Sequence, residues 1–246
     1  KLRVINVGSL APAGSLPGVV DPIAGHCTAN FCQGAAMTQD GFQSAMAAGK
    51  AEAQHAVDEN ADLLIGGEMG IGNTTAATAL LSHWLDIAPS TLAGPGTGLN
   101  PEGVAHKVKV IERALQLHGA DIGQPELLLQ RLGGYEIVAL TGFYIAGAQA
   151  GKALLVDGFI CTAAALLALA MNPSISPYLF FSHASAEPGY QALLPYIPSA
   201  PLLDLQLRLG EGSGAATCVP LLKMACAIHN EMATFAQAQV SEKSVD

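Results

Sequence analysis

The stretch GGEMGIGNTTAATALL, residues 66–81, decides the fold of this chain. The apolar residues 62–65 before it predict a strand, and its glycines predict a turn whose backbone can approach a ligand closely. The following Asn-Thr-Thr, residues 73–75, is typical of a helix start. A helix N-terminus behind a glycine-rich turn offers free N–H groups to an anion, most often a phosphate. The stretch therefore predicts a strand, a phosphate-binding turn and a helix in succession.

The turn matches neither of the two best-known phosphate loops. Read as GxxxxGK[ST], Gly67 and Gly72 fit, but Asn73 stands where the lysine for the β- and γ-phosphates is needed. The spacing of GxGxxG fails as well. A nucleoside triphosphate is therefore not expected, and the turn is predicted to hold a single phosphate through Gly70, Ile71, Gly72, Asn73, Thr74 and Thr75.

Strands and helices alternate along the rest of the chain. Strands are predicted at 2–7, 62–65, 152–156, 178–182 and 203–209, and an irregular loop at 8–21. Helices are predicted at 38–57, 75–84, 101–118, 125–132, 137–149 and 158–171, and one long helix or a helix pair at 215–239. This alternation predicts an α/β fold, with a Rossmann-like parallel sheet covered by helices on both faces. We expect residues 1–210 to form the core. Residues 211–246 are expected to add a C-terminal helical segment of the same domain, within a smaller helical lobe.

Composition excludes several classes of protein. A net charge of −9 disfavours binding to nucleic acid, which needs a basic face. The longest uncharged apolar run, residues 158–171, is shorter than a membrane span. Five cysteines without a CxxC pair indicate reduced thiols in a cytoplasmic protein, and no metal site is expected.

Three long motifs, in this order, resemble one enzyme family. GGEMGIGNTTAATALL, then GPGTGLN at 94–100 and RLGEGSGAA at 208–216, are similar to nicotinate-nucleotide:dimethylbenzimidazole phosphoribosyltransferases, which make the lower-ligand nucleotide of cobalamin. The segments SLPGVVD near the start and NEMATFAQAQVS near the end extend the resemblance over essentially the whole chain. Members of the family carry a further N-terminal part that this sequence does not include.

The resemblance implies roles for two carboxylates. Glu211 corresponds to the general base of the family, and Glu68 to a second acidic residue of its site. Each has a simpler interpretation, because Glu211 could be a carboxylate stabilised at a helix N-terminus and Glu68 could hydrogen-bond its own turn.

The resemblance also implies that Lys107 lies near the nucleotide phosphate, and that His183 and Ser185 lie near the ribose or phosphate. Otherwise Lys107 is one more lysine on a solvated helix face, and His183 a hydrogen-bonded loop histidine. The second glycine-rich turn adds Gly96, Thr97 and Gly98 to the predicted binding residues.

The implied reaction moves the phosphoribosyl group of nicotinate mononucleotide to 5,6-dimethylbenzimidazole, giving α-ribazole 5′-phosphate and nicotinate. It needs no cofactor, because the cationic nicotinate ring is a good leaving group. A homodimer acting on small molecules is the implied assembly. The alternative is a truncated or inactive relative that serves as a nucleotide- or azole-binding module.

Overall fold

The computed structural model describes residues 1–24, 27–119 and 122–239 of the chain. Its central sheet contains β3 (Leu63–Gly66), β4 (Ala153–Val156) and β5 (Leu179–Phe181), paired in parallel in the order β3-β4-β5. The three predicted strands are confirmed. Because parallel strands end at the same edge, the loops that follow β3, β4 and β5 meet there.

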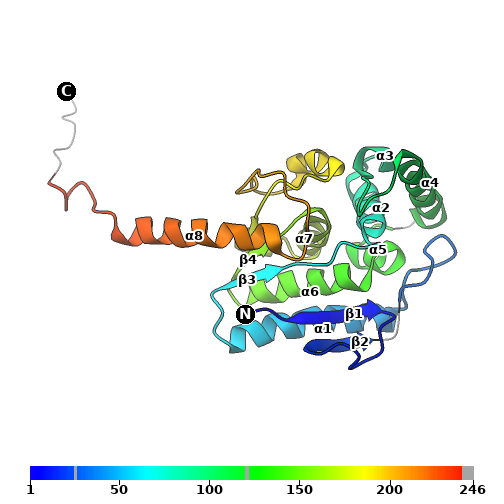
Figure 1. Cartoon of the computed structure of the whole chain (residues 1–246), viewed down its shortest axis with the longest axis horizontal. Helices are drawn as coiled ribbons and strands as arrows, with labels where there is room; N and C mark the ends of the chain where they lie inside the picture. Colours follow the sequence, from blue (N-terminus) through cyan, green and yellow to red (C-terminus); the bar gives the residue numbers. More distant parts are fainter. Residues whose placement is uncertain (25–26, 120–121, 240–246) are drawn as a thin grey trace.

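Helices cover both faces of this sheet (Figure 1). Successive residues of a strand point to opposite faces. Leu154 packs on one face next to Gly147 of α6 (Tyr135–Gln149), within the main core that also buries α7 (Phe159–Met171). Leu155 packs on the other face with Ala215 and Cys218, in the first turns of α8 (Ser213–Glu231). The predicted α/β class is therefore confirmed.

The helix α1 (Gln39–Asp58) packs along α6 and begins where the sequence predicts. The Thr38 side chain caps it by accepting a hydrogen bond from the Gly41 amide. At the crossing, a Cβ on Gly49 would overlap the Ala139 carbonyl, so only glycine permits this approach.

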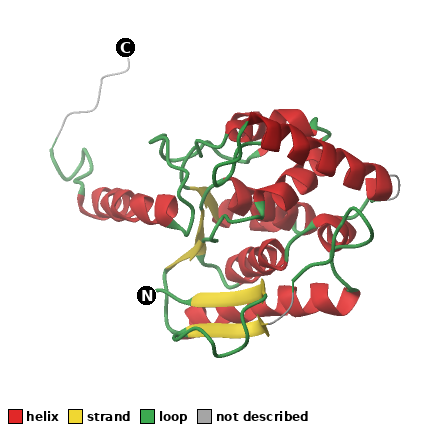
Figure 2. Ribbon diagram, turned by 45° about the vertical axis from the view of Figure 1, so that its right-hand side comes forward, coloured by secondary structure: helices red, strands yellow, loops and turns green. Residues whose placement is uncertain are grey.

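A separate pair of parallel strands, β1 (Val4–Ser9) and β2 (Val19–Ala24), lies beside α1 (Figure 2). The prediction of an irregular loop over residues 8–21 is wrong at both ends, because β1 continues to Ser9 and β2 begins at Val19. The prolines and glycines of this region lie mainly in the connection between the two strands. The register of the pair is also interrupted by bulges, so the sequence shows no regular alternation that would indicate β2.

A group of four helices follows β3. These are α2 (Thr74–Leu85), the short α3 (Pro89–Leu92), α4 (Pro101–His118) and α5 (Pro125–Leu132). Three were predicted, and the Asn100 side chain caps α4 through the Gly103 amide as its position before Pro101 suggests. The 3₁₀ helices η2 (Pro173–Tyr178) and η3 (Pro188–Tyr196) flank β5.

The predicted strand at 203–209 is wrong. Although its polar and apolar residues alternate, only Leu203 forms a parallel bridge, to His183, and Gln206 has a positive φ of 55°. The segment still runs beside 182–186, where the amides of Ala184 and Ala186 donate to the carbonyls of Leu203 and Leu207. The left-handed residue interrupts the ladder between these two bonds.

The C-terminal helix α8 leaves the body of the molecule and projects from it (Figure 1). It ends at Glu231, so the prediction of a helix to residue 239 is wrong by two turns. Residues 240–246 of the predicted C-terminal segment lie outside the described residues, and the division at residue 210 stays a prediction. Across the described ranges, no helix is both long and apolar enough to cross a membrane.

Candidate active site

A hollow of about 70 Å³ opens at the carboxyl edge of the central sheet. The turn after β3, the residues after β4, the loop after β5 and the segment before α8 all contribute to it. Seven predicted site residues line the hollow, namely Glu68, Gly70, Thr74, Gly96, Thr97, His183 and Ser185, together with Met69, Asp157, Gly158, Phe159, Ile160, Glu187, Arg208, Leu209 and Gly210. The structure thus brings together segments that are far apart in the sequence.

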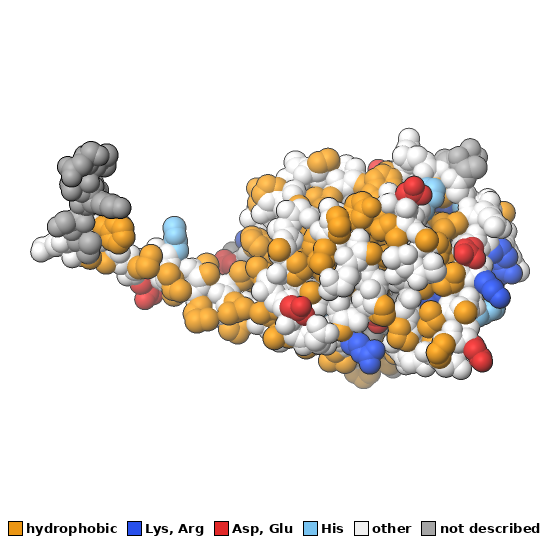
Figure 3. All heavy atoms as spheres, turned by 90° about the horizontal axis from the view of Figure 1, so that it is seen from above, with side chains coloured by type: hydrophobic (Ala, Val, Ile, Leu, Met, Phe, Trp, Pro, Cys, Tyr) orange, Lys and Arg blue, Asp and Glu red, His pale blue; other side chains and the backbone are white. Residues whose placement is uncertain are grey.

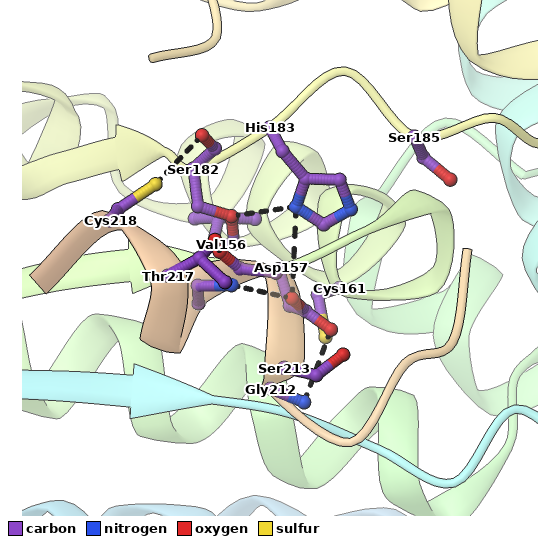
Figure 4. A network of polar contacts seen from close by, with 12 residues as sticks. Val156, Asp157, Cys161, Ser182, His183, Ser185, Gly212, Ser213, Thr217 and Cys218 are labelled. Carbon is purple, nitrogen blue, oxygen red and sulfur yellow. Dashed lines mark hydrogen bonds and ion pairs between the residues drawn. The ribbon is translucent and has the colours of Figure 1, made fainter. Parts of the chain in front are cut away.

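Asp157 ties the start of α8 to the end of β4 (Figure 4). Its side chain is only 1% exposed, and its two oxygens accept hydrogen bonds from the amides of Gly212 (3.1 Å) and Ala215 (2.9 Å). A carboxylate in this position satisfies free N–H groups of the helix and complements the helix dipole. Asp157 therefore fixes the turn that carries Glu211.

His183 lies buried beside this carboxylate, with its Nδ1 3.0 Å from Ser182 Oγ and 3.8 Å from Asp157 Oδ1 (Figure 4). Burial lowers the pKa of His183, and the charge of Asp157 partly opposes that shift. The ring packs so closely on α8 that a Cβ on Gly214 would overlap it. His183 is therefore a hydrogen-bonded loop histidine that lines the hollow, and its place near the ribose or phosphate stays a prediction.

Glu68 follows β3 and folds back onto its own turn. Its Oε2 accepts hydrogen bonds from the Gly70 amide (2.5 Å) and from Asn73 Nδ2 (2.6 Å), which is the simpler interpretation made from the sequence. Burial raises the pKa of Glu68; these two hydrogen bonds oppose the shift, and the charges of Asp157 and Glu211 add to it. Glu68 therefore shapes the turn while also lining the hollow.

Glu211 sits in the neighbouring turn, with a left-handed φ of 58°. Its amide donates a 2.7 Å hydrogen bond to the Glu68 carbonyl, and the Gly67 and Gly212 backbones are in contact beside it. Its side chain is exposed and is not among the groups, within the described residues, that line the hollow. The structure thus joins the turns of Glu68 and Glu211 but leaves the Glu211 side chain exposed, outside the lining of the hollow.

Lys107 is buried, with 5% of its surface exposed, so the interpretation as part of a solvated helix face is wrong. Its Nζ donates to Thr74 Oγ1 (2.7 Å) and to the Gly94 carbonyl (3.1 Å). Burial lowers the pKa of Lys107, and the charge of Glu187 partly opposes this. Lys107 thereby connects the start of α2 to the second glycine-rich turn, beside Gly96 and Thr97.

The residues predicted to bind the phosphate face two different hollows, one on each side of the turn. Gly70 and Thr74 face the hollow described above, whereas Ile71, Gly72, Asn73 and Thr75 line a second hollow on the other side. Gly98 lines neither of these two hollows. Asn73 occupies the N-cap position of α2, but its side chain makes no capping hydrogen bond there and instead donates from Nδ2 to Glu68.

The sequence argument missed Asp157 and Arg208 as site residues. A signal for Asp157 was present, because an Asp-Gly pair directly follows the predicted strand at 152–156, and carboxyl ends of strands are where such sheets bind ligands. Among the described residues, no group of three or more His, Cys, Asp or Glu side chains is arranged to hold a metal ion.

A family model described as phosphoribosyltransferase matches residues 1–240. The nicotinate-nucleotide–dimethylbenzimidazole phosphoribosyltransferase of Pseudomonas fluorescens is 53% identical over 243 residues, which are 99% of this chain and 69% of that protein. The enzyme of the same name from Pseudomonas putida is also 53% identical, over 98% of this chain and 69% of its own length.

Two solved structures are also similar to this chain. The crystal structure of the enzyme of this name from Thermus thermophilus superimposes with a TM-score of 0.89 at 41% identity, over 98% of this chain and 71% of that one. A second crystal structure from the same organism gives a TM-score of 0.90 at 42% identity, over 98% and 72% of the two chains.

Proposed function

The chain belongs to the nicotinate-nucleotide–dimethylbenzimidazole phosphoribosyltransferase family, and we propose how its site performs that transfer. The phosphoribosyl group of nicotinate mononucleotide passes to 5,6-dimethylbenzimidazole, giving α-ribazole 5′-phosphate and nicotinate. The observation that carries the assignment of roles is the meeting of the Lys107–Thr74 pair with the turns of Glu68 and Glu211 at one edge of the sheet.

The 5′-phosphate binds at the Lys107 side of the hollow. Lys107 supplies a positive charge, while Thr74, Thr97 and the free amides at the start of α2 supply hydrogen-bond donors. The burial of Lys107 supports this role, because a buried cation gains from an anionic ligand that compensates for its lost hydration.

The bond from C1′ to the nicotinate nitrogen breaks, and its electron pair neutralises the positive ring. A benzimidazole nitrogen attacks C1′ from the opposite face and forms the new bond. The second nitrogen then releases its proton, which Glu211 accepts as general base. The exposed position of the Glu211 carboxylate supports this role, since the hollow itself, at about 70 Å³, is smaller than pockets that enclose whole small molecules. The benzimidazole therefore lies on the open side, next to Glu211.

The remaining polar groups position the nucleotide. We assign His183 and Ser185 to the ribose or phosphate, because both line the hollow next to Gly158. Glu68 holds the turn in place through Gly70 and Asn73 and presents its carboxyl to the ribose or the benzimidazole.

Product formation tests this function. The chain is incubated with nicotinate mononucleotide and 5,6-dimethylbenzimidazole, and α-ribazole 5′-phosphate and nicotinate are quantified by chromatography. We expect both products in equal amounts. A chain that shows a thermal shift with nicotinate mononucleotide but forms neither product would instead be a nucleotide-binding module.

We further propose that the protein is a cytoplasmic homodimer. All five cysteines are free, as suits a reducing compartment. Figure 3 shows apolar side chains along the projecting arm of α8, where Leu221, Met224 and Ile228 are exposed. An exposed apolar stripe of this kind supports association with a second copy of the chain.

A further inference from the structure

The contacts of His183 determine which of its two ring nitrogens carries a proton. Ser182 Oγ donates its own hydrogen to the Val156 carbonyl at 2.7 Å, so toward His183 Nδ1, 3.0 Å away, it can only accept. The Asp157 carboxylate, 3.8 Å from Nδ1, is a second acceptor on the same side. Because burial lowers the pKa of His183, the ring is neutral above about pH 7. Its single proton therefore lies on Nδ1.

The other ring nitrogen, Nε2, is left as an acceptor that faces the active-site hollow. It points away from Ser182 and Asp157 (Figure 4). Within residues 1–24, 27–119 and 122–239 it makes no hydrogen bond and is not among the enclosed polar atoms, so it is open to the hollow that His183 lines. A Cβ built on Gly158 would lie 3.7 Å from Nε2 and 3.5 Å from Ser185 Oγ. Nε2 and Ser185 Oγ therefore face the same part of the hollow.

An acceptor nitrogen in this place requires a donor from the ligand. A phosphate oxygen is itself an acceptor, and the buried Asp157 carboxylate beside the ring would repel its charge. A hydroxyl group can donate to Nε2 and accept from Ser185 Oγ at the same time. Nicotinate mononucleotide carries two such groups, the 2′- and 3′-hydroxyls of its ribose, whereas the N–H of 5,6-dimethylbenzimidazole is assigned above to Glu211.

The position of His183 favours the 2′-hydroxyl. The ring packs on Gly214, and the neighbouring Asp157 holds the amide of Gly212, so His183 lies beneath the turn that carries Glu211. Lys107, which is assigned above to the 5′-phosphate, contacts a different set of groups. His183 is therefore placed on the side of C1′, and the 2′-hydroxyl is attached to the carbon next to C1′.

We propose, resting on the function proposed above, that His183 Nε2 accepts a hydrogen bond from the 2′-hydroxyl and so selects ribonucleotides over 2′-deoxyribonucleotides. No proton is transferred in this contact. As nicotinate leaves, the ribose ring gains positive charge, which the electron-withdrawing O2′ opposes. An acceptor on the hydroxyl proton increases the electron density on O2′, and hydrogen bonds to this hydroxyl strengthen in such transition states. His183 thus acts on binding and on the chemical step.

The contact is tested by titration calorimetry of nicotinate mononucleotide and its 2′-deoxy analogue with the native chain and His183→Asn. Asparagine keeps an N–H₂ group near the position of Nδ1, where it can donate to Ser182 Oγ, and removes the acceptor at Nε2. We expect the variant to bind nicotinate mononucleotide about tenfold more weakly, and to bind the 2′-deoxy analogue within about threefold of the native chain. An equal loss with both nucleotides, or no loss with either, would overturn the proposal.

Matched changes separate this role from a structural one. His183→Gln places an amide oxygen near the position of Nε2 and should recover most of the affinity for nicotinate mononucleotide. The 3′-deoxy analogue keeps the proposed donor, so its binding should fall about tenfold in His183→Asn, as with the full nucleotide. His106→Asn, at an exposed position of α4, should change no affinity. In turnover, His183→Asn should lower kcat, because the contact strengthens in the transition state.

The protonation of the ring is measured on the native chain, so the test does not depend on the folding of a variant. We expect ¹⁵N NMR above about pH 7 to show a proton on Nδ1 of His183 and none on Nε2. A proton on Nε2 would disprove the proposal.

Product formation from nicotinate mononucleotide and 5,6-dimethylbenzimidazole is measured separately. A chain that forms no product but loses affinity only for nucleotides with a 2′-hydroxyl in His183→Asn would contradict the proposed reaction and retain this contact. An active chain with equal losses for both nucleotides would do the reverse.

Discussion

Glu211 combines a fixed backbone with a free carboxylate. Its amide is bonded to the Glu68 carbonyl, so Glu211→Gln keeps the turn and the shape of the side chain and removes only the basicity. We expect kcat to fall by about 100-fold or more while both substrates bind nearly as well, which is typical of the loss of a general base. Steady-state kinetics together with calorimetry check this. Full turnover in the variant would leave Glu211 as a structural residue and make Glu68 the next candidate.

Lys107 is expected to act on binding rather than on the chemical step. A contact to a phosphate that does not react is made equally in the ground state and the transition state, so Lys107→Met should raise KM for nicotinate mononucleotide about 10- to 100-fold with a smaller change in kcat. Methionine keeps the apolar stem in its buried place. Lys109→Met, at an exposed position of the same helix, is the control. A change confined to kcat would contradict the phosphate role.

At the scale of elements, the junction of β4 and α8 depends on Asp157. Asp157→Asn replaces one acceptor by an N–H₂ group that faces a backbone amide, so the start of α8 should loosen. We expect a loss of about 1–3 kcal/mol in the free energy of unfolding. We also expect a lower kcat, because Glu211 directly precedes Gly212, whose amide donates to Asp157.

Urea unfolding and turnover are measured on the same Asp157→Asn preparation. The exposed Asp204→Asn is the matched change and should leave both values unaltered. If Asp157→Asn had the same unfolding free energy as the native chain, the hydrogen bonds from Gly212 and Ala215 to Asp157 would contribute little to stability.

Glu136, at the start of α6, is expected to make the free energy of unfolding depend on pH. Glu136 is partly exposed as a residue, but its Oε1 is buried, and burial raises the pKa of Glu136 to about 7, with the charge of Glu68 adding to the shift and hydrogen bonds opposing it. Because the folded pKa lies above the unfolded one, this group stabilises the fold fully below about pH 4.5 and loses that contribution as pH rises through 7.

Relative to Glu136→Gln, the native chain should therefore lose about 3 kcal/mol of unfolding free energy between pH 4.5 and pH 8. Urea unfolding of both chains at the two pH values measures the difference. Glu112→Gln, at an exposed position, should follow the native chain. An equal change in unfolding free energy between the two pH values for Glu136→Gln and the native chain would show that the carboxyl keeps its ordinary pKa.

Local signals in the sequence predicted most of these elements. Thr38 and Asn100 act as the caps that their spacing suggests, and the apolar runs of β3 and β4 are strands because both faces of the sheet are buried. The segment 203–209 shows where such signals fail. Its alternation fits a strand, but pairing depends on the neighbouring chain, and the left-handed Gln206 limits it to isolated contacts.

The side-chain partners in the site were less predictable than the elements. Glu68 could be placed after a strand from sequence alone, but its bond to Asn73 depends on how one turn folds. The burial of Lys107 depends on the packing of α4 against α2, which helical periodicity does not reveal. Motif resemblance supplied the identity of these residues, and only the fold shows what they contact.

At the scale of the whole molecule, α8 gives a test of association. Its exposed Met224 and Ile228 lie about one turn apart on the projecting helix, so the double variant Met224→Glu, Ile228→Glu should prevent two chains from meeting there. Light scattering after gel filtration should give a dimer for the native chain and a monomer for the variant. Lys223→Glu, on the same helix, serves as the control for added charge. A native monomer would contradict the homodimer.

The hydrogen bond between the Glu211 amide and the Glu68 carbonyl joins residues separated by more than half of the chain. Closing so large a loop costs conformational entropy that only the packed strands and helices between the two turns can offset. The site is therefore expected to form late in folding. During synthesis from the N-terminus, the turn at 66–75 leaves the ribosome well before its partner near residue 211, and the newly made protein becomes active only after that second turn has emerged.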